Sequence, residues 1–104
     1  MNNFKYFSDL KTEIADIPSD GIISQMILKE GKSKAILFGF APGQELSEHT
    51  VAQPATLHFM EGEADVALGD DSLQVQAGAW VYLPANMPHS ILAKTRVVML
   101  LMMV

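Results

Sequence analysis

The 104-residue chain contains no cysteine, so no disulfide can stabilise it and no thiolate can act as a nucleophile. This absence fits a reducing compartment. Basic residues are also scarce: seven Lys and Arg stand against twelve Asp and Glu, which gives a formal net charge of −5 at pH 7. The basic residues are scattered, whereas a protein that follows a phosphate backbone needs them clustered. We therefore expect no nucleic-acid partner.

Long apolar runs are missing as well. The longest, residues 97–104, has eight residues and suits a buried strand, whereas a membrane-spanning helix needs about 20. Residues 1–11 lack the basic segment and apolar region of a secretory signal. We expect a cytoplasmic protein with no membrane partner. Hydrophobic residues make up 49% of the chain, which is enough to build the core of one domain.

The first twenty residues differ in pattern from the rest. Phe4, Phe7, Leu10, Ile14 and Ile17 recur at spacings of three and four, which is typical of one helix face, and residues 18–21 (Pro-Ser-Asp-Gly) end the pattern. Two interpretations are open: a short helix, or a turn or extended arm that packs its aromatic residues onto the remainder. We assign residues 1–20 to an N-terminal arm or helical turn and residues 21–104 to a single domain.

Short apolar stretches separated by turn residues fill the chain after Gly21. Eight of them are interpreted as strands: residues 22–29, 34–41, 55–62, 63–69, 72–76, 79–85, 89–94 and 96–104. Such spacing is typical of an all-β sandwich or barrel. No stretch after Gly21 predicts a helix of ten or more residues, so the predicted fold class is all-β.

Residues 47–59 contain two of the three histidines, His49 and His58, and we expect His49 on a half-buried strand. Gly43 is followed by five residues and then His49, and Gly62 follows after a further apolar segment. A second glycine-to-histidine spacing occurs later, with Gly78 followed by Pro84 and then His89.

These two spacings resemble the two short motifs of the cupin family, over residues 42–93. The first family motif contains two histidines and a glutamate; here only the first histidine, His49, is kept, and Val51 and Ala55 occupy the other two positions. In the second motif His89 is kept, Asn86 replaces a glycine and Ala93 replaces an asparagine.

The resemblance implies a double-stranded β-helix, that is, a jelly-roll barrel of two antiparallel sheets. It also implies a divalent metal at the open end of the barrel, held in the family by three histidines and one glutamate. Only His49 and His89 carry over as metal ligands. Gly43 and Gly62 are expected at strand ends with positive φ, and Asn86 is the best non-glycine residue for such a conformation.

A third metal ligand would have to come from outside the family pattern, and the candidates are Gln53 and His58. Counting faces back from Gly62 places His58 with Thr56 and Met60, which should point outward. A β-bulge nearby could reverse that direction. Two imidazoles suit several ions, so the metal could be Ni, Zn, Mn, Fe or Cu, and the absence of any metal is equally open.

A mostly apolar pocket around His49 and His89 is the form expected of a small-molecule site. Its expected lining is Val51, Ala55, Leu57, Phe59, Trp80 and Tyr82. Three interpretations remain open: a cupin that binds a divalent metal and a small molecule, with or without catalysis; a metal-free module that binds or senses a small ligand; and a dimeric scaffold whose pocket has degenerated. We also expect a homodimer, formed through outward apolar residues such as Met60, Val66 and Leu68 or their alternates.

Overall fold

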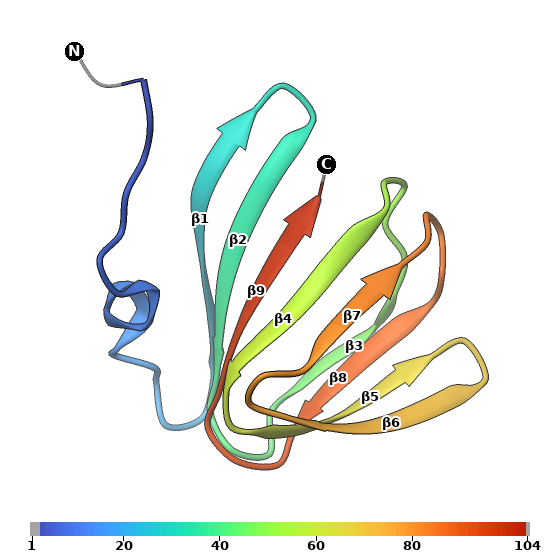
Figure 1. Cartoon of the computed structure of the whole chain (residues 1–104). Coiled ribbons are helices and arrows are strands. Elements are labelled where there is room, and N and C mark those ends of the chain that lie inside the picture. The colour runs from blue at the N-terminus through green and yellow to red at the C-terminus, as the bar shows by residue number, and fades with distance from the viewer. Residues whose placement is uncertain (1–2, 104) are drawn as a thin grey trace.

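Two antiparallel sheets make up the computed structural model, which describes residues 3–103 (Figure 1). The larger sheet has the order β1 (Ile22–Glu30), β2 (Ser33–Phe40), β9 (Val97–Met103), β4 (Ala55–Glu61) and β7 (Trp80–Leu83). The smaller sheet has the order β3 (Glu45–His49), β8 (His89–Ala93), β5 (Glu63–Leu68) and β6 (Asp71–Gln76). The chain passes repeatedly between the two sheets, as in a jelly roll. The predicted all-β jelly-roll class is confirmed.

All eight stretches that the sequence predicts as strands form strands, with ends shifted by a few residues at most. The ninth strand, β3, was not among the eight because its sequence, Glu-Leu-Ser-Glu-His, has no apolar alternation. It carries His49 as expected. However, only Leu46 of β3 is partly buried and the other four residues are exposed, so the strand is less buried than predicted.

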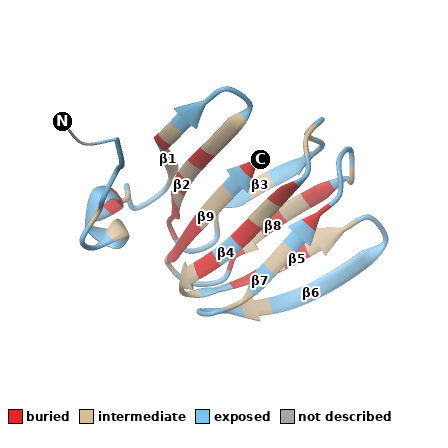
Figure 2. Ribbon diagram, turned by 45° about the horizontal axis from the view of Figure 1, so that its top comes forward, coloured by how far each residue is buried: buried red, intermediate tan, exposed pale blue. Residues whose placement is uncertain are grey.

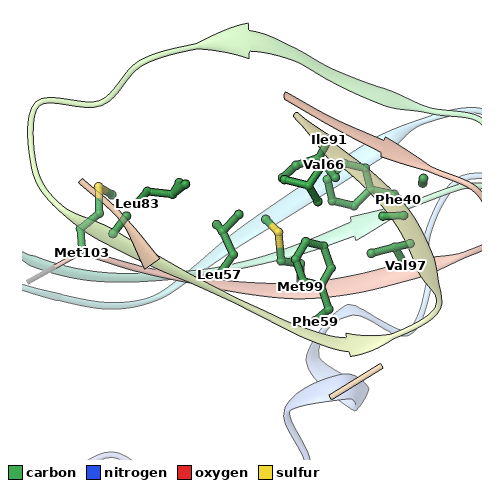
Figure 3. Close-up of a cluster of buried hydrophobic side chains, with 12 residues drawn as sticks. Phe40, Leu57, Phe59, Val66, Leu83, Ile91, Val97, Met99 and Met103 are labelled. Atoms are coloured by element: carbon green, nitrogen blue, oxygen red, sulfur yellow. The ribbon is translucent and has the colours of Figure 1, made fainter. Parts of the chain in front are cut away.

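The main core lies between the two sheets and follows from the alternation of side chains along each strand. Figure 2 shows buried positions alternating with more exposed ones along β4 and β8. The buried side chains from both sheets meet in one cluster (Figure 3), whose largest members are Phe40, Leu57, Phe59, Val66, Leu83, Ile91, Val97, Met99 and Met103. Val66 belongs to this core and Leu68 packs against it, so the expectation that these two residues point outward toward a second subunit is wrong.

A second apolar cluster lies on the outer face of the larger sheet, under the N-terminal segment. Its buried members are Ile14, Ile27, Ala35, Leu37 and Val98, and Phe7, Leu10, Ile17 and Met60 pack against them. The only helical part of residues 3–20 is a five-residue 3-10 helix, η1 (Leu10–Ile14). The arm interpretation therefore describes the segment better than a longer helix does. The prediction that its aromatic residues pack onto the sheet is confirmed only for Phe7. Phe4 is 69% exposed.

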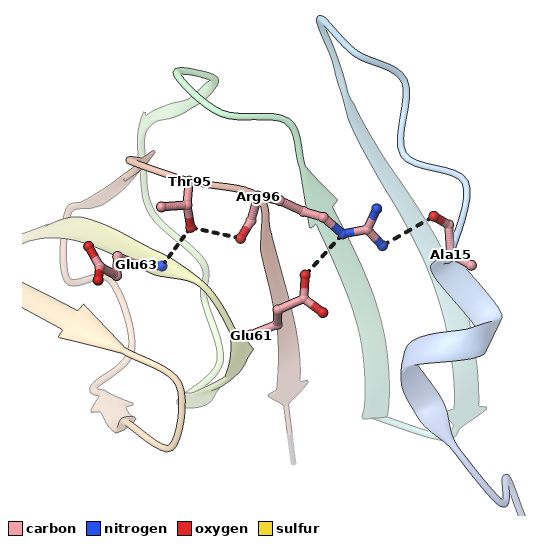
Figure 4. Close-up of polar contacts among 5 residues, drawn as sticks. All are labelled: Ala15, Glu61, Glu63, Thr95 and Arg96. Atoms are coloured by element: carbon pink, nitrogen blue, oxygen red, sulfur yellow. Dashed lines mark hydrogen bonds and ion pairs between the residues drawn. The ribbon is translucent and has the colours of Figure 1, made fainter.

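Arg96 ties the N-terminal segment to the larger sheet (Figure 4). Its Nε donates to Oε2 of Glu61 at 3.0 Å, and its Nη2 donates to the carbonyl of Ala15 at 3.1 Å. Next to it, Thr95 Oγ1 accepts from the Glu63 backbone N–H at 3.0 Å and donates to the Arg96 carbonyl at 2.9 Å. These bonds join the end of β4, the start of β5 and the residue after η1.

Three turns contain the positive φ angles that the motif spacing predicts. Gly43 has φ of 84°, Gly62 has φ of 89° and Asn86 has φ of 67°. The turn at Asn86 leads directly into β8, which begins at His89. Within residues 3–103, no helix is both long and apolar enough to cross a membrane.

Candidate functional site

His49 and His89 lie side by side on neighbouring strands of the smaller sheet. They are directly paired residues of β3 and β8, next to an irregularity in β3 between Leu46 and His49. The centroids of the two imidazole rings are 4.2 Å apart and the ring planes are inclined at 53°. We call these two residues the histidine pair.

Both imidazoles use the same nitrogen to contact the backbone. His49 Nδ1 lies 2.8 Å from the carbonyl oxygen of Ser47, and His89 Nδ1 lies 3.0 Å from the carbonyl oxygen of Met87. A carbonyl oxygen can only accept, so each Nδ1 carries the hydrogen and donates it. In the neutral ring Nε2 is then the acceptor. The backbone therefore selects the same tautomer in both histidines and leaves both Nε2 lone pairs for a ligand.

The two histidines differ in burial. His89 is 3% exposed, and Leu68 of β5 lies directly beside it in the sheet, whereas His49 is exposed. The Nε2 atom of His89 forms no hydrogen bond with another described residue. Since no buried side-chain nitrogen or oxygen in residues 3–103 lacks a partner, this atom reaches solvent. The His89 ring is thus held by the surrounding core, whereas the His49 ring lies on the solvent side of the pair.

The family positions between the two histidines carry no donor atoms in this chain. Val51 is partly buried in the loop between β3 and β4. Ala55 is 1% exposed in β4, where it pairs with Leu83 and Met103 in the core. Of the ligand set that the cupin resemblance implies, only the histidine pair is present in this chain.

His58 does not lie near the histidine pair. It pairs with Trp80 of β7 and Leu100 of β9, on the outer face of the larger sheet, and its side chain is exposed. Leu57 and Phe59, its neighbours in β4, point into the core instead. The suggestion of His58 as a third ligand is wrong, and the outward direction counted from the strand alternation is confirmed.

Gln53, the other candidate third ligand, is engaged elsewhere through its amide nitrogen. Its Nε2 donates to the carbonyl of Lys32, in the β1–β2 turn, at 2.8 Å. This contact leaves its Oε1, the atom that could ligate a metal, without a partner among residues 3–103. Within residues 3–103 no group of three or more His, Cys, Asp or Glu side chains is arranged to hold a metal ion.

The expected pocket lining requires a correction at β7. Trp80 and Tyr82 are 63% and 53% exposed and share the outer face with His58, so they do not line a pocket inside the barrel. The inward residues of β7 are Val81 and Leu83. Side-chain alternation alone does not show which set of β7 residues points inward, because Trp80 and Tyr82 are as apolar in character as Val81 and Leu83.

Other predicted lining residues do point inward, but they belong to the packed core. Ala55, Leu57 and Phe59 are each 1% exposed. Further inward residues that sequence reasoning missed are partly buried against this core, among them Leu46, Leu68, Val81 and Met87. Leu68 is the residue of β5 that pairs with His89 in the sheet. Met87 contacts His89 through its backbone carbonyl, which accepts a hydrogen bond from the imidazole Nδ1.

Comparison with known proteins identifies the same architecture. A family model described as a cupin domain matches residues 36–104. A conserved protein of unknown function from Streptococcus pyogenes superposes with a TM-score of 0.86 at 25% identity, covering 99% of this chain and 91% of that one. No curated protein matches.

Two further solved structures show the fold alone. A cupin superfamily protein from Desulfitobacterium hafniense has a TM-score of 0.82 at 22% identity, covering 86% of this chain and 82% of that one. The protein TT1209 from Thermus thermophilus has a TM-score of 0.81 at 19% identity, covering 93% of this chain and 95% of that one.

Proposed function

Because the chain belongs to the cupin domain family, we propose that the histidine pair binds one divalent transition metal and, with it, a small molecule. The observation that supports this proposal is the shared hydrogen-bond pattern of the two rings. Both Nδ1 atoms are held by backbone carbonyls, so both Nε2 atoms are available as ligands. A neutral imidazole nitrogen is among the commonest metal ligands in proteins.

The carbonyl contacts also suit a metal site. A hydrogen bond from the second ring nitrogen fixes the orientation of a ligating histidine and makes the other nitrogen more basic. Ser47 and Met87 supply that contact through backbone atoms, which a side-chain substitution at either position would leave in place.

The donor set fits a metal with several open positions. Two imidazoles are fewer than the three protein ligands usual in catalytic zinc sites, and no carboxylate of residues 3–103 accompanies them. Imidazole nitrogens without carboxylates favour Cu, Ni, Zn or Fe over Mn. Water, the Oε1 of Gln53 or a donor atom of the small molecule would occupy the remaining positions. When bound, the metal would supply a Lewis acid at the histidine pair.

A metal-free site is the second candidate, and the loss of the ligands at Val51 and Ala55 favours it. In this case the two Nε2 acceptors would receive hydrogen bonds from a hydroxyl or amine group of a small ligand. The apolar side chains of Leu68 and Met87 beside His89 would contact the apolar part of that ligand.

Elemental analysis of the protein, purified without an affinity tag or chelator, tests the first proposal. We expect a stoichiometric transition metal in the wild type, and its loss in His49→Ala and in His89→Ala. His58→Ala is the matched control. It removes the third histidine, which lies on the outer face of the larger sheet, away from the histidine pair on the smaller sheet. This variant should keep the metal content of the wild type. His49 is exposed, so His49→Ala should fold normally even if His89→Ala does not.

A wild type that holds no metal after incubation with Zn, Ni, Cu and Fe salts would refute the metal site. The metal-free candidate would then be tested by thermal unfolding in the presence of small hydroxylated and amine compounds. A ligand that binds only the native state raises the unfolding temperature, and His49→Ala should abolish that increase.

A further inference from the structure

Two lysines, Lys29 of β1 and Lys34 of β2, are paired directly across the first hairpin. Like charges directly opposite each other on one face of a sheet repel and lower its stability. Neither lysine forms an ion pair with another residue of the described range 3–103 that would offset this repulsion. We call these two residues the lysine pair.

A β-bulge in β1 places Lys29 on the same face as its partner. The register shifts between Met26 and Leu28, so Ile27 is the extra residue. Met26 lies on the inner face, because the residue of β2 that pairs with it packs against the main core. Under strict alternation Lys29, three residues later, would point to the outer face. The bulge reverses its direction, as bulges do where a side chain is re-aimed, so the lysine pair lies on the inner face.

An apolar strip adjoins the lysine pair on this inner face. It is formed by Met26 of β1, Ile36 and Phe38 of β2, and Leu101 of β9. None of the four is fully buried, and Met26 is 48% exposed. The larger sheet has five strands and the smaller has four, so the inner face of the edge strand β1 is left partly uncovered. From Lys34 to Phe38 the strip extends about 13 Å, at ~3.3 Å per residue.

The lysine pair and the histidine pair lie at the same end of the barrel. Lys34 shares a register row of the larger sheet with Ala55, the first residue of β4. The loop before Ala55 begins directly after His49. In that loop, Gln53 donates to the carbonyl of Lys32 in the β1–β2 turn at 2.8 Å. This turn lies at the top of Figure 1, on the same side as the end of β9.

We propose that the small molecule bound at this end of the barrel is an amphipathic carboxylic acid. Its carboxylate contacts the lysine pair and its apolar body lies on the apolar strip. This inference rests on the proposed function, because it names the chemical class of the small molecule. Two ammonium groups with no acidic partner in residues 3–103 attract one carboxylate, which also relieves their mutual repulsion. The adjoining strip selects an acid with an apolar body over a small polar anion.

The distribution of charge along the chain favours this one position for an anion. Residues 35–93, which include all four strands of the smaller sheet, contain no Lys or Arg. Their acidic residues are Glu45, Glu48, Glu61, Glu63, Asp65, Asp70 and Asp71. An anionic ligand is therefore repelled by most of the barrel and attracted to the β1–β2 hairpin.

Calorimetric titration with octanoate tests the proposal, first on the protein as purified and then after dialysis against a chelator. We expect saturable binding in the wild type. In Lys29→Gln/Lys34→Gln the affinity should fall about 10-fold, because two partly exposed ion pairs together contribute about that factor. Lys11→Gln/Lys94→Gln is the matched control. It removes two positive charges from exposed positions elsewhere, so it should bind octanoate like the wild type.

Two further comparisons separate the carboxylate from the apolar body. Octanol has the same chain without the charge, so its weaker binding should be equal in the wild type and in Lys29→Gln/Lys34→Gln. Met26→Ser should weaken octanoate binding several-fold, because it removes part of the apolar strip. Met102→Ser is its control, since Met102 is also exposed, at 38%, but lies on the outer face of β9.

Three results would overturn the proposal: a wild type that does not bind octanoate, equal affinity in the wild type and in Lys29→Gln/Lys34→Gln, or an equal loss in both double variants. The last result would show a response to net charge alone. Metal content does not enter these comparisons, because each is made with and without the chelator. A protein that holds no metal can still bind octanoate at the lysine pair, and a metal-loaded protein can fail to bind it.

Discussion

Gly62 shows at the scale of one residue how a missing side chain permits the passage from one sheet to the other. It joins β4 of the larger sheet to β5 of the smaller one with φ of 89°. A Cβ at this position would collide with the backbone carbonyl of Arg96, which cannot move aside as a flexible side chain can. Gly69 also has positive φ, of 58°, but nothing lies within 4 Å of its Cβ position. Substitution of Gly69 by alanine therefore tests backbone strain alone, and substitution of Gly62 tests strain together with the collision.

We expect Gly62→Ala to lower the free energy of unfolding by more than about 3 kcal/mol, and Gly69→Ala by about 1 kcal/mol. Urea unfolding of both variants measures the difference. Equal losses would show that the Arg96 carbonyl moves freely and that only the φ angle matters. The motif spacing alone predicts the positive φ of Gly62. It does not reveal the collision, because that contact joins segments far apart in the sequence.

At the scale of an element, the N-terminal segment depends on Arg96. The two hydrogen bonds of Arg96 join Ala15 to Glu61. Arg96→Ala should cost only about 1 kcal/mol of global stability, because the Arg96–Glu61 pair is partly exposed and water screens it. The larger effect should be local: the segment should open more often, and trypsin should cleave after Lys11 several-fold faster.

Lys94→Ala is the control for this prediction. Lys94 forms a comparable exposed ion pair with Asp65, at 3.3 Å, but has no bond to the N-terminal segment. Its removal should leave the cleavage rate after Lys11 unchanged. If Arg96→Ala also leaves that rate unchanged, apolar packing alone holds the segment in place.

The same segment shows what can be read from sequence at this scale. The three- and four-residue spacing of Leu10, Ile14 and Ile17 identified which side chains pack together, and they do. It did not identify the conformation, since a short 3-10 helix and its flanking turns bring the same side chains onto a sheet. At β7 the strand itself was predicted correctly. Which of its side chains point into the core was not, because the neighbouring residues Trp80 and Val81 are both apolar.

At the scale of the whole molecule, the sequence predicted most of the fold and half of the site. Regular strand spacing and the two motifs predicted the two-sheet barrel. The motifs also predicted the positions of His49 and His89, which the structure pairs directly. The matching backbone contacts at Ser47 and Met87 could not be predicted, because they depend on side-chain torsions that follow from packing.

The arrangement of the sheets also predicts which strands open first. β9 pairs with β2 on one side and β4 on the other. Its inward residues lie in the main core, and its outward residues Val98 and Leu100 lie in the second cluster. Among the described residues β6 pairs with β5 alone, and none of its residues is fully buried. The free energy needed to open β6 should therefore lie well below that needed to open β9.

Hydrogen exchange measured by NMR should show this difference directly. We expect the amides of β9 to exchange only through global unfolding, and those of β6 to exchange at least ~100-fold faster through local opening. Amides of β6 that exchange as slowly as those of β9 would contradict this order, since they would show that the two sheets open only as one unit.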